Sequence, residues 1–291
     1  MKINEKKRAE RLAVIDNIAA ALSDGDTFRK VELGDPRPTA AQIKKVILPF
    51  DNLRVRKINK VKRNIALNIA RRATVALNSE TEIVGLENLA AVEGGAIITS
   101  NHFNPLDSTP IRLMAMCVDR EDELSIVVQE SNIFMKGFFG FLMRNCNTMP
   151  VSSNLSYMAR NLKPALKSKM ENGELVLIYP EQEMWFNYKK PREMRDGAYH
   201  YAAEFGVPII PCFTEMRKTD EIDDTGFYKV RYILHVMPPI YPDTELSSRE
   251  RREDMKRRDI LLKRECYERV YGIPLDGEFI PERDIAGYKK I

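Results

Sequence analysis

A histidine and an aspartate stand five residues apart in the segment TSNHFNPLD, residues 99–107. An imidazole side chain titrates near neutral pH, and a carboxylate placed like that of Asp107 can hold the imidazole of His102 in one tautomer. Together the two side chains form a general base. The same spacing also suits a purely structural hydrogen bond within a loop, so the pair by itself leaves both interpretations open.

A strand and the start of a helix flank this pair. Gly94-Gly95 followed by the apolar residues 96–98 predicts a turn and a buried strand, and Ser108-Thr109-Pro110 is typical of a helix start. His102 and Asp107 are therefore expected in a strand-to-helix loop. Such loops, at the carboxyl ends of parallel strands, are where open α/β sheets place their sites.

Strands and helical stretches alternate from Glu80 onward. We expect an α/β fold with a mixed, mostly parallel sheet flanked by helices, together with an amino-terminal helical extension and a carboxy-terminal helix. The last predicted strand alternates in polarity and ends before two prolines, so it is predicted to be an edge or antiparallel strand. The predicted strands cover residues 81–84, 96–99, 124–128, 148–151, 175–179, 208–213 and 228–237.

The amino-terminal part is helical and basic. Residues 1–77 hold 18 Lys or Arg against 8 Asp or Glu, a surplus of +10 that leaves −6 for the rest of a chain with net charge +4. Helices are predicted over 4–23, from Thr39, and over 54–77. The last is basic and amphipathic, which suits either a helix packed on its own domain or one lying on anionic lipid. Its apolar positions are Ile58, Val61, Ile65, Ile69, Ala73 and Ala76.

The chain divides into three predicted regions. A basic amphipathic helical region covers 1–79, an α/β core covers 80–245, and a charged helix with a tail packed on the core covers 246–291. Ser247 and Glu250 form a capping box that opens this last helix.

Composition narrows the class of protein further. A hydrophobic content of 44% in 291 residues is sufficient for a large core without disulfides. The four cysteines are far apart, which argues against a zinc site and favours a reducing, cytoplasmic setting. No signal peptide, no run of 18 apolar residues and no nucleotide-binding glycine loop is apparent. We therefore expect no metal and no bound cofactor.

Two further blocks carry the functional assignment. One is Tyr179-Pro180-Glu181-Gln182 after an apolar strand, and the other is the segment VPIIP at 207–211. With Asn101-His102-(x4)-Asp107 they resemble, in order and spacing, the blocks of the glycerolipid acyltransferase family, which are Asn-His-(x4)-Asp, Phe-Pro-Glu-Gly and Val-Pro-Ile-x-Pro. The resemblance covers about residues 80–240.

The resemblance implies an O-acyltransferase that moves a fatty acyl group from acyl-CoA or acyl carrier protein to a lysophospholipid such as 1-acylglycerol 3-phosphate. His102 would take the proton of the acceptor hydroxyl and return it to the departing thiol, while Asp107 orients the imidazole. No protein nucleophile is required. We expect a cytoplasmic protein held peripherally on the inner face of the membrane by its basic helix, with no nucleic-acid partner.

The chain departs from the family at two positions that are expected to hold phosphate-binding arginines. Ser153 stands at one, and Gln182-Glu183-Met184 replaces the expected Gly-Thr-Arg. A non-phosphorylated acceptor is therefore an alternative, as are a catalytically silent lipid-binding protein and a nucleic-acid-binding protein. The residues that we expect around the acceptor are Asn101, Glu181, Gln182, Lys189, Lys190, Arg192, Arg144 and Arg160.

Three of these features have a plainer interpretation. Glu181 either contacts the acceptor or only organises its own loop. The apolar stretch 133–143 is core, shelter for an acyl chain, or a surface that dips into the membrane interface. His200 and His235 are expected to be structural, and Trp185 is expected to pack.

Overall fold

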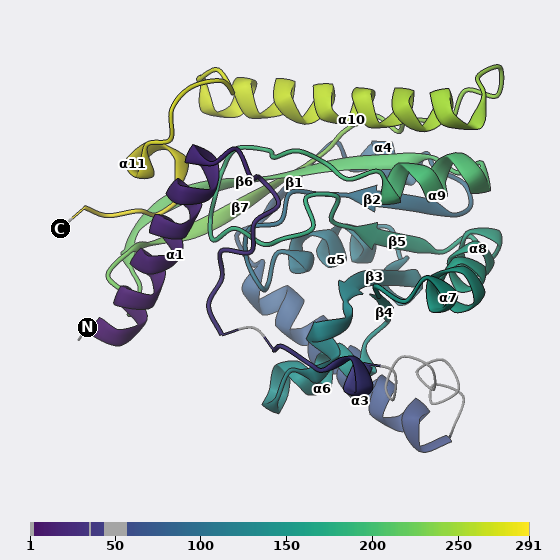
Figure 1. The fold of residues 1–291 in the computed structure, drawn as a ribbon, viewed down its shortest axis with the longest axis horizontal. Coiled ribbons are helices and arrows are strands. Elements are labelled where there is room, and N and C mark those ends of the chain that lie inside the picture. Colours follow the sequence, from purple (N-terminus) through teal and green to yellow (C-terminus); the bar gives the residue numbers. More distant parts are fainter. Residues whose placement is uncertain (1–2, 35, 44–56, 291) are drawn as a thin grey trace.

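Seven strands form one sheet in the order β1-β7-β6-β2-β5-β3-β4 (Figure 1). All neighbouring strands are parallel except β6 and β7, which are antiparallel. The predicted α/β fold with a mixed, mostly parallel sheet is thus confirmed. The structure is a computed structural model that describes residues 3–34, 36–43 and 57–290, with side chains from residue 60 in the last range.

The strands match the predicted order along the chain. They are β1 (Glu82–Val84), β2 (Ala96–Thr99), β3 (Leu124–Gln129), β4 (Thr148–Val151), β5 (Leu175–Ile178), β6 (Ile209–Ile222) and β7 (Tyr228–Val236).

Helices connect the strands and flank both faces of the sheet. They are α1 (Glu5–Ser23), α3 (Lys57–Leu77), α4 (Leu86–Ala90), α5 (Ser108–Cys117), α6 (Gly137–Asn145), α7 (Leu155–Tyr157), α8 (Lys163–Glu171), α9 (Gly197–Phe205), α10 (Ser248–Tyr271) and α11 (Pro281–Asp284). Single 3-10 or π turns lie at η1 (Glu121–Glu123), η2 (Glu130–Phe134) and η3 (Met158–Leu162).

The β6–β7 hairpin differs from the sequence prediction. β6 was predicted to end at Phe213 but continues to Ile222, because its polar half pairs with β7, for example Arg217 with Arg231. Backbone hydrogen bonds hold a polar strand that hydropathy does not reveal. β7 is antiparallel to β6, one of the two predicted alternatives, but it is parallel to β1 and lies between these two strands, so it is not an edge strand.

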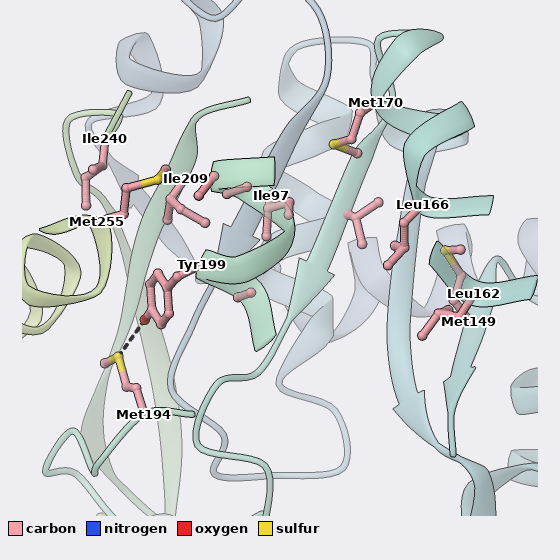
Figure 2. Close-up of a cluster of buried hydrophobic side chains, with 14 of the residues drawn as sticks. Ile97, Met149, Leu162, Leu166, Met170, Met194, Tyr199, Ile209, Ile240 and Met255 are labelled. Carbon is pink, nitrogen blue, oxygen red and sulfur yellow. Dashed lines mark hydrogen bonds between the residues drawn. The ribbon is translucent and has the colours of Figure 1, made fainter. Parts of the chain in front are cut away.

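The alternation of side chains along β2 divides the core into two layers. Ile97 faces a cluster with α8, α9 and α10, which Figure 2 shows around Tyr199, Leu166 and Met255. Ala96 and Ile98 face the opposite side and pack against α4 and α5. Since successive residues of a strand point to opposite faces, a strand of four buried residues is covered on both sides.

A buried polar network fixes the carboxyl end of β2. Lys263 and Asp259 of α10 form an ion pair at 2.7 Å, and both side chains are 0% exposed. The Thr99 hydroxyl donates to Asp259 at 2.7 Å and accepts from Lys263 at 2.8 Å. Tyr199 of α9 also donates to Asp259 at 2.6 Å. The end of β2, three residues before His102, is thereby tied to two helices.

The helix α3 exposes part of the apolar face for which the sequence left two interpretations open, packing on its own domain or contact with anionic lipid. Val61 and Ile65 are 55% and 49% exposed, whereas Ala66 and Thr74 are buried. The reason lies in polar contacts: Arg63 donates to Asn147 at 2.9 Å and Arg71 pairs with Glu121 at 3.1 Å, which turns the opposite face of α3 inward.

The other amino-terminal predictions fall partly within the described residues. α1 confirms the predicted helix over 4–23, and residues 40–43 are helical after Thr39. Positions 44–50 and 54–56 of the predicted helices lie outside the described residues. Within the part of the chain that is described, no helix combines the length and the hydropathy that a membrane crossing requires.

Candidate active site

Two loops meet at the carboxyl ends of neighbouring parallel strands. The loop 100–107 follows β2, and the turn Tyr179–Gln182 follows β5, which pairs with β2 in parallel register. A cleft of about 1560 Å³ opens at this edge and is lined by residues of both loops, including His102, Asp107 and Tyr179. The site therefore lies where the predicted strand-to-helix loop placed it.

The carboxylate of Asp107 accepts four hydrogen bonds. Its Oδ2 accepts from His102 Nδ1 at 2.6 Å and from the backbone N–H groups of Phe103 at 2.9 Å and Asn104 at 3.3 Å. Its Oδ1 accepts from the Tyr179 hydroxyl at 2.7 Å. Asp107 is the N-cap residue of α5, yet its side chain makes no capping hydrogen bond. The Asp107 carboxylate, which could cap the helix, accepts hydrogen bonds from the loop that carries His102 instead.

This arrangement fixes the tautomer of His102. An ionised carboxylate only accepts hydrogen bonds, so Nδ1 of His102 carries the proton that is donated to Asp107. Nε2 is left with its lone pair and has no partner among the described residues. The His102 side chain is 22% exposed and lines the cleft. The imidazole is therefore a base whose free nitrogen is accessible from the cleft.

Tyr179 contacts both members of the pair. Its ring stacks on the His102 imidazole with centroids 4.2 Å apart and planes inclined by 18°. Burial, followed by the charge of Asp107, raises the pKa of the Tyr179 hydroxyl well above its ordinary value. The hydroxyl thus keeps its proton and remains a donor to Asp107.

Glu181 is buried and organises the loop beside His102. Its Oε2 accepts from the His102 backbone N–H at 3.2 Å and its Oε1 accepts from the Arg192 N–H at 3.1 Å. The Arg192 guanidinium pairs with Glu181 Oε2 at 3.0 Å, and each side chain is 2% exposed. Arg192 also donates to the carbonyls of Thr27 and Glu183. These contacts correspond to the loop-organising interpretation of Glu181.

Arg192 does not reach the cleft, contrary to its expected place beside the acceptor. Its guanidinium pairs with Glu181, donates to carbonyl oxygens, and lies over the Trp185 ring at 4.4 Å. Burial lowers the pKa of the guanidinium and Glu181 opposes that shift. Arg192 is therefore placed as the counter-ion of a buried carboxylate.

Lys189 and Lys190 point to the carboxy-terminal segment rather than to the cleft. Lys190 Nζ lies 3.5 Å from Asp284 Oδ2 and donates to the Gly277 carbonyl at 3.2 Å. Lys189 lies over the Tyr271 ring at 5.0 Å. Their proximity in sequence to Glu181 predicts that these two lysines bind phosphate. In the structure, both side chains instead contact residues of the carboxy-terminal segment.

The other predicted acceptor residues divide between structure and surface. Asn101 is buried and exchanges two hydrogen bonds with the Thr214 backbone, at 2.8 and 3.1 Å, so it clamps the loop to β6. Arg144 donates to the carbonyls of Ile133 and Met135, and Arg160 is exposed on η3 outside the cleft lining. Only Gln182 of this set lines the cleft, with a left-handed φ of 64° at the position where the resembled family has glycine.

The cleft contains a cation that the sequence did not single out. Arg195 is exposed, lines the cleft, and donates its backbone N–H to the Pro180 carbonyl at 2.8 Å. It lies over the Phe28 ring at 3.6 Å and forms no ion pair within the described residues. By contrast, the lining residues Lys7 and Arg11 are paired with carboxylates. No local signal distinguishes Arg195 from other arginines, because the loop that returns it to Pro180 spans fourteen residues.

Part of the cleft lining is apolar, and we call this part the apolar branch. Its residues belong to α6, β4 and η3, apart from one that lies between η2 and α6, and they are Met135, Phe139, Met143, Val151, Met158 and Leu162. The predicted apolar stretch 133–143 thus faces the cleft at three of these positions and leaves Phe138 55% exposed. Such a lining suits a hydrocarbon chain.

Part of the chain is similar to proteins of known family. Residues 80–215 match the protein-family model described as Acyltransferase. No curated protein is matched significantly by the sequence. Among solved structures, the chain is similar to the crystal structure of the 1-acyl-sn-glycerophosphate (LPA) acyltransferase PlsC from Thermotoga maritima, with a TM-score of 0.43 and 17% identity. That likeness covers 76% of this chain and 88% of the other.

We predict that Arg192→Met lowers the free energy of unfolding by about 3–5 kcal/mol, because it leaves the Glu181 carboxylate buried without its counter-ion. Urea denaturation measures this loss. Lys167→Met, which removes an exposed cation paired with Glu171, is the control and should leave the urea midpoint almost unchanged. An Arg192→Met protein with the wild-type midpoint would contradict the structural role.

Proposed function

We propose, from the match of residues 80–215 to the acyltransferase family model, that the protein is an O-acyltransferase that moves a fatty acyl group from a thioester to a lysophospholipid hydroxyl. The observation that carries this proposal is the 2.6 Å contact between His102 Nδ1 and Asp107, with the other imidazole nitrogen accessible from the cleft.

Acyl transfer by the His102–Asp107 pair involves two proton transfers. His102 Nε2 takes the proton of the acceptor hydroxyl while the hydroxyl oxygen attacks the carbonyl carbon of the thioester. The tetrahedral intermediate then expels the thiolate, which takes the proton back from Nε2. Asp107 stabilises the imidazolium that exists between these steps. The acceptor supplies the nucleophile, so no covalent acyl-enzyme forms.

The donor is an acyl thioester, either acyl-CoA or acyl carrier protein, and no bound cofactor takes part. The apolar branch of the cleft supports this assignment because methionine, phenylalanine and branched side chains line it. A fatty acyl chain placed there would leave its thioester carbon near the mouth that carries His102. Removal of the chain from water favours binding by about 0.8 kcal/mol for each buried methylene.

In this proposal the acceptor binds in the same cleft. Arg195, which lines the cleft, can hold an acceptor phosphate in place of the arginines that are missing at Ser153 and Met184. A second candidate is acyl transfer to a non-phosphorylated lipid. It is favoured by the carboxylates of Glu130 and Glu183, which also line the cleft and would repel a phosphate monoester.

The helices α3 and α6 supply a surface for anionic lipid. They contact one another, as Figure 1 shows, and expose Val61, Ile65 and Phe138. Lys60, Lys62 and Arg72 are exposed on the same helix α3. Phe139 of α6 is both 47% exposed and part of the cleft lining, so a lipid tail can pass from the membrane interface to the apolar branch.

We predict that His102→Ala reduces transfer from an acyl-CoA to a lysophospholipid at least about 10³-fold, because the proton acceptor is lost. Asp107→Asn should cost about 10³- to 10⁴-fold, because the amide favours the wrong tautomer. A radiolabelled acyl-transfer assay on folded protein measures both. His200→Ala is the control for the loss of an imidazole: His200 also lines the cleft, but it is exposed, pairs with Glu204 and makes no contact with Asp107. Full activity of His102→Ala would contradict the mechanism, and wild-type protein that retains lipid but turns over no acceptor would point to a silent relative.

The acceptor assignment is tested with Arg195→Gln. If Arg195 holds a phosphate, KM for lysophosphatidate rises about 10- to 100-fold, as expected for the loss of a charged hydrogen bond, while KM for monoacylglycerol stays unchanged. Arg160→Gln is the control, because it removes an exposed arginine outside the cleft lining. Wild-type preference for monoacylglycerol, with no effect of Arg195→Gln, would favour the non-phosphorylated acceptor.

Membrane binding is tested with the double variant Ile65→Ser, Phe138→Ser. Wild-type protein should sediment with phosphatidylglycerol vesicles, and the double variant should bind at least about tenfold more weakly, because two apolar side chains no longer enter the interface. Leu261→Ser on α10 is the control, since it removes an exposed apolar side chain that belongs to neither α3 nor α6. Equal binding of all three proteins would contradict the proposed surface.

A further inference from the structure

Tyr179 is a departure from the family pattern that the proposed function does not explain. The resembled block begins with phenylalanine, whereas this chain has tyrosine at that position. The additional hydroxyl donates to Asp107 Oδ1 at 2.7 Å, and the ring stacks on His102. A phenylalanine would keep the stacking and lose only the hydrogen bond.

We propose that Tyr179 is a positioning residue that favours the proton-accepting form of His102 by sharing the charge of Asp107. This inference rests on the proposed function, in which neutral His102 is the active form.

The two carboxylate oxygens of Asp107 differ in their surroundings. Oδ2 accepts three hydrogen bonds, from His102 Nδ1 and from two backbone N–H groups of the same loop. Tyr179 is the partner that the described residues provide to Oδ1. Without the hydroxyl, more of the negative charge would remain to attract a protonated imidazole. With the hydroxyl, that attraction is weaker, so the imidazolium form of His102 is less favoured.

The hydroxyl also fixes the plane of the carboxylate. Bonds to both oxygens, from the loop 102–104 on one side and from the β5 turn on the other, prevent Asp107 from rotating about its side-chain axis. The stacked Tyr179 ring limits rotation of the imidazole. His102 Nε2 is thus held toward the cleft by two contacts of one side chain.

The other charged groups around His102 do not replace this effect. Glu181, whose Oε2 accepts from the His102 N–H, is neutralised by Arg192. Tyr232 of β7 stays protonated, because burial and the charge of Asp107 raise its pKa to about 12. Glu183 in the following loop accepts from Gln129 at 2.6 Å. Asp107 is therefore the charge through which Tyr179 acts on His102.

Tyr179→Phe tests the inference in two independent measurements. The first is the NMR titration of the His102 imidazole in the full-length protein without ligand, with the signal assigned from His102→Ala. We expect the midpoint to move upward by about half a pH unit in Tyr179→Phe, because the unshared carboxylate favours the imidazolium. An unchanged or lower midpoint would overturn the proposal.

The second measurement is the pH profile of kcat/KM for acyl transfer. Its acid limb should move upward by the same amount, while the plateau at higher pH stays within about tenfold of wild type, because Asp107 keeps its other three donors. A lowered plateau with an unmoved limb would mean that the hydroxyl only stabilises the loop, and would overturn the proposal.

Tyr199→Phe is the matched control. It removes another buried tyrosine hydroxyl that donates to an aspartate, here Asp259 at 2.6 Å, and it does not contact His102. This variant should lose stability without moving the His102 midpoint or the acid limb. If wild-type protein transfers no acyl group, the proposed function fails, whereas the NMR titration still decides the role of Tyr179.

Discussion

The carboxylate of Asp107 is the point at which the loops of the site are joined. It accepts hydrogen bonds from His102 and two backbone N–H groups of one loop and from Tyr179 of another. It makes no capping hydrogen bond to α5, although Asp107 is the N-cap residue of that helix. A buried carboxylate must be compensated by donors, so the loops can adopt few other arrangements. Other polar contacts hold the segments that carry these donors: Thr99 is bound to α10, and Asn101 is bound to β6.

The sequence predicts the parts of this site that are local. The strand before His102, the helix after Asp107 and the block at Tyr179 all have short-range signals, and parallel pairing of β2 and β5 brings them together. Contacts between distant segments were not predictable. Arg192 was itself predicted beside the acceptor but pairs with the buried Glu181, and Arg195 reaches the cleft only because a long loop returns to Pro180. The sequence left open which face of α3 is exposed, since hydropathy alone does not reveal that Arg63 and Arg71 anchor the other face.

Segments outside residues 80–215 complete the surroundings of the site. The chain after α1 provides carbonyls at Thr27 and Arg29 that accept from Arg192 and from the Trp185 indole. The carboxy-terminal segment binds Lys190 through Asp284, and α10 carries the buried Asp259–Lys263 pair. Because a buried ion pair contributes little net stability, this pair is better understood as setting the position of α10 on β2. The family-matched region thus depends on both flanking segments for its loop geometry.

In the proposed mechanism His102 activates the hydroxyl of the acceptor and is never itself acylated. Initial rates over a grid of acyl-CoA and lysophospholipid concentrations, with intact-protein mass spectrometry of enzyme incubated with donor alone, test this mechanism. It requires intersecting double-reciprocal lines, which indicate a ternary complex, and an unmodified protein mass. Parallel lines, together with an acyl adduct that is absent from His102→Ala, would contradict it.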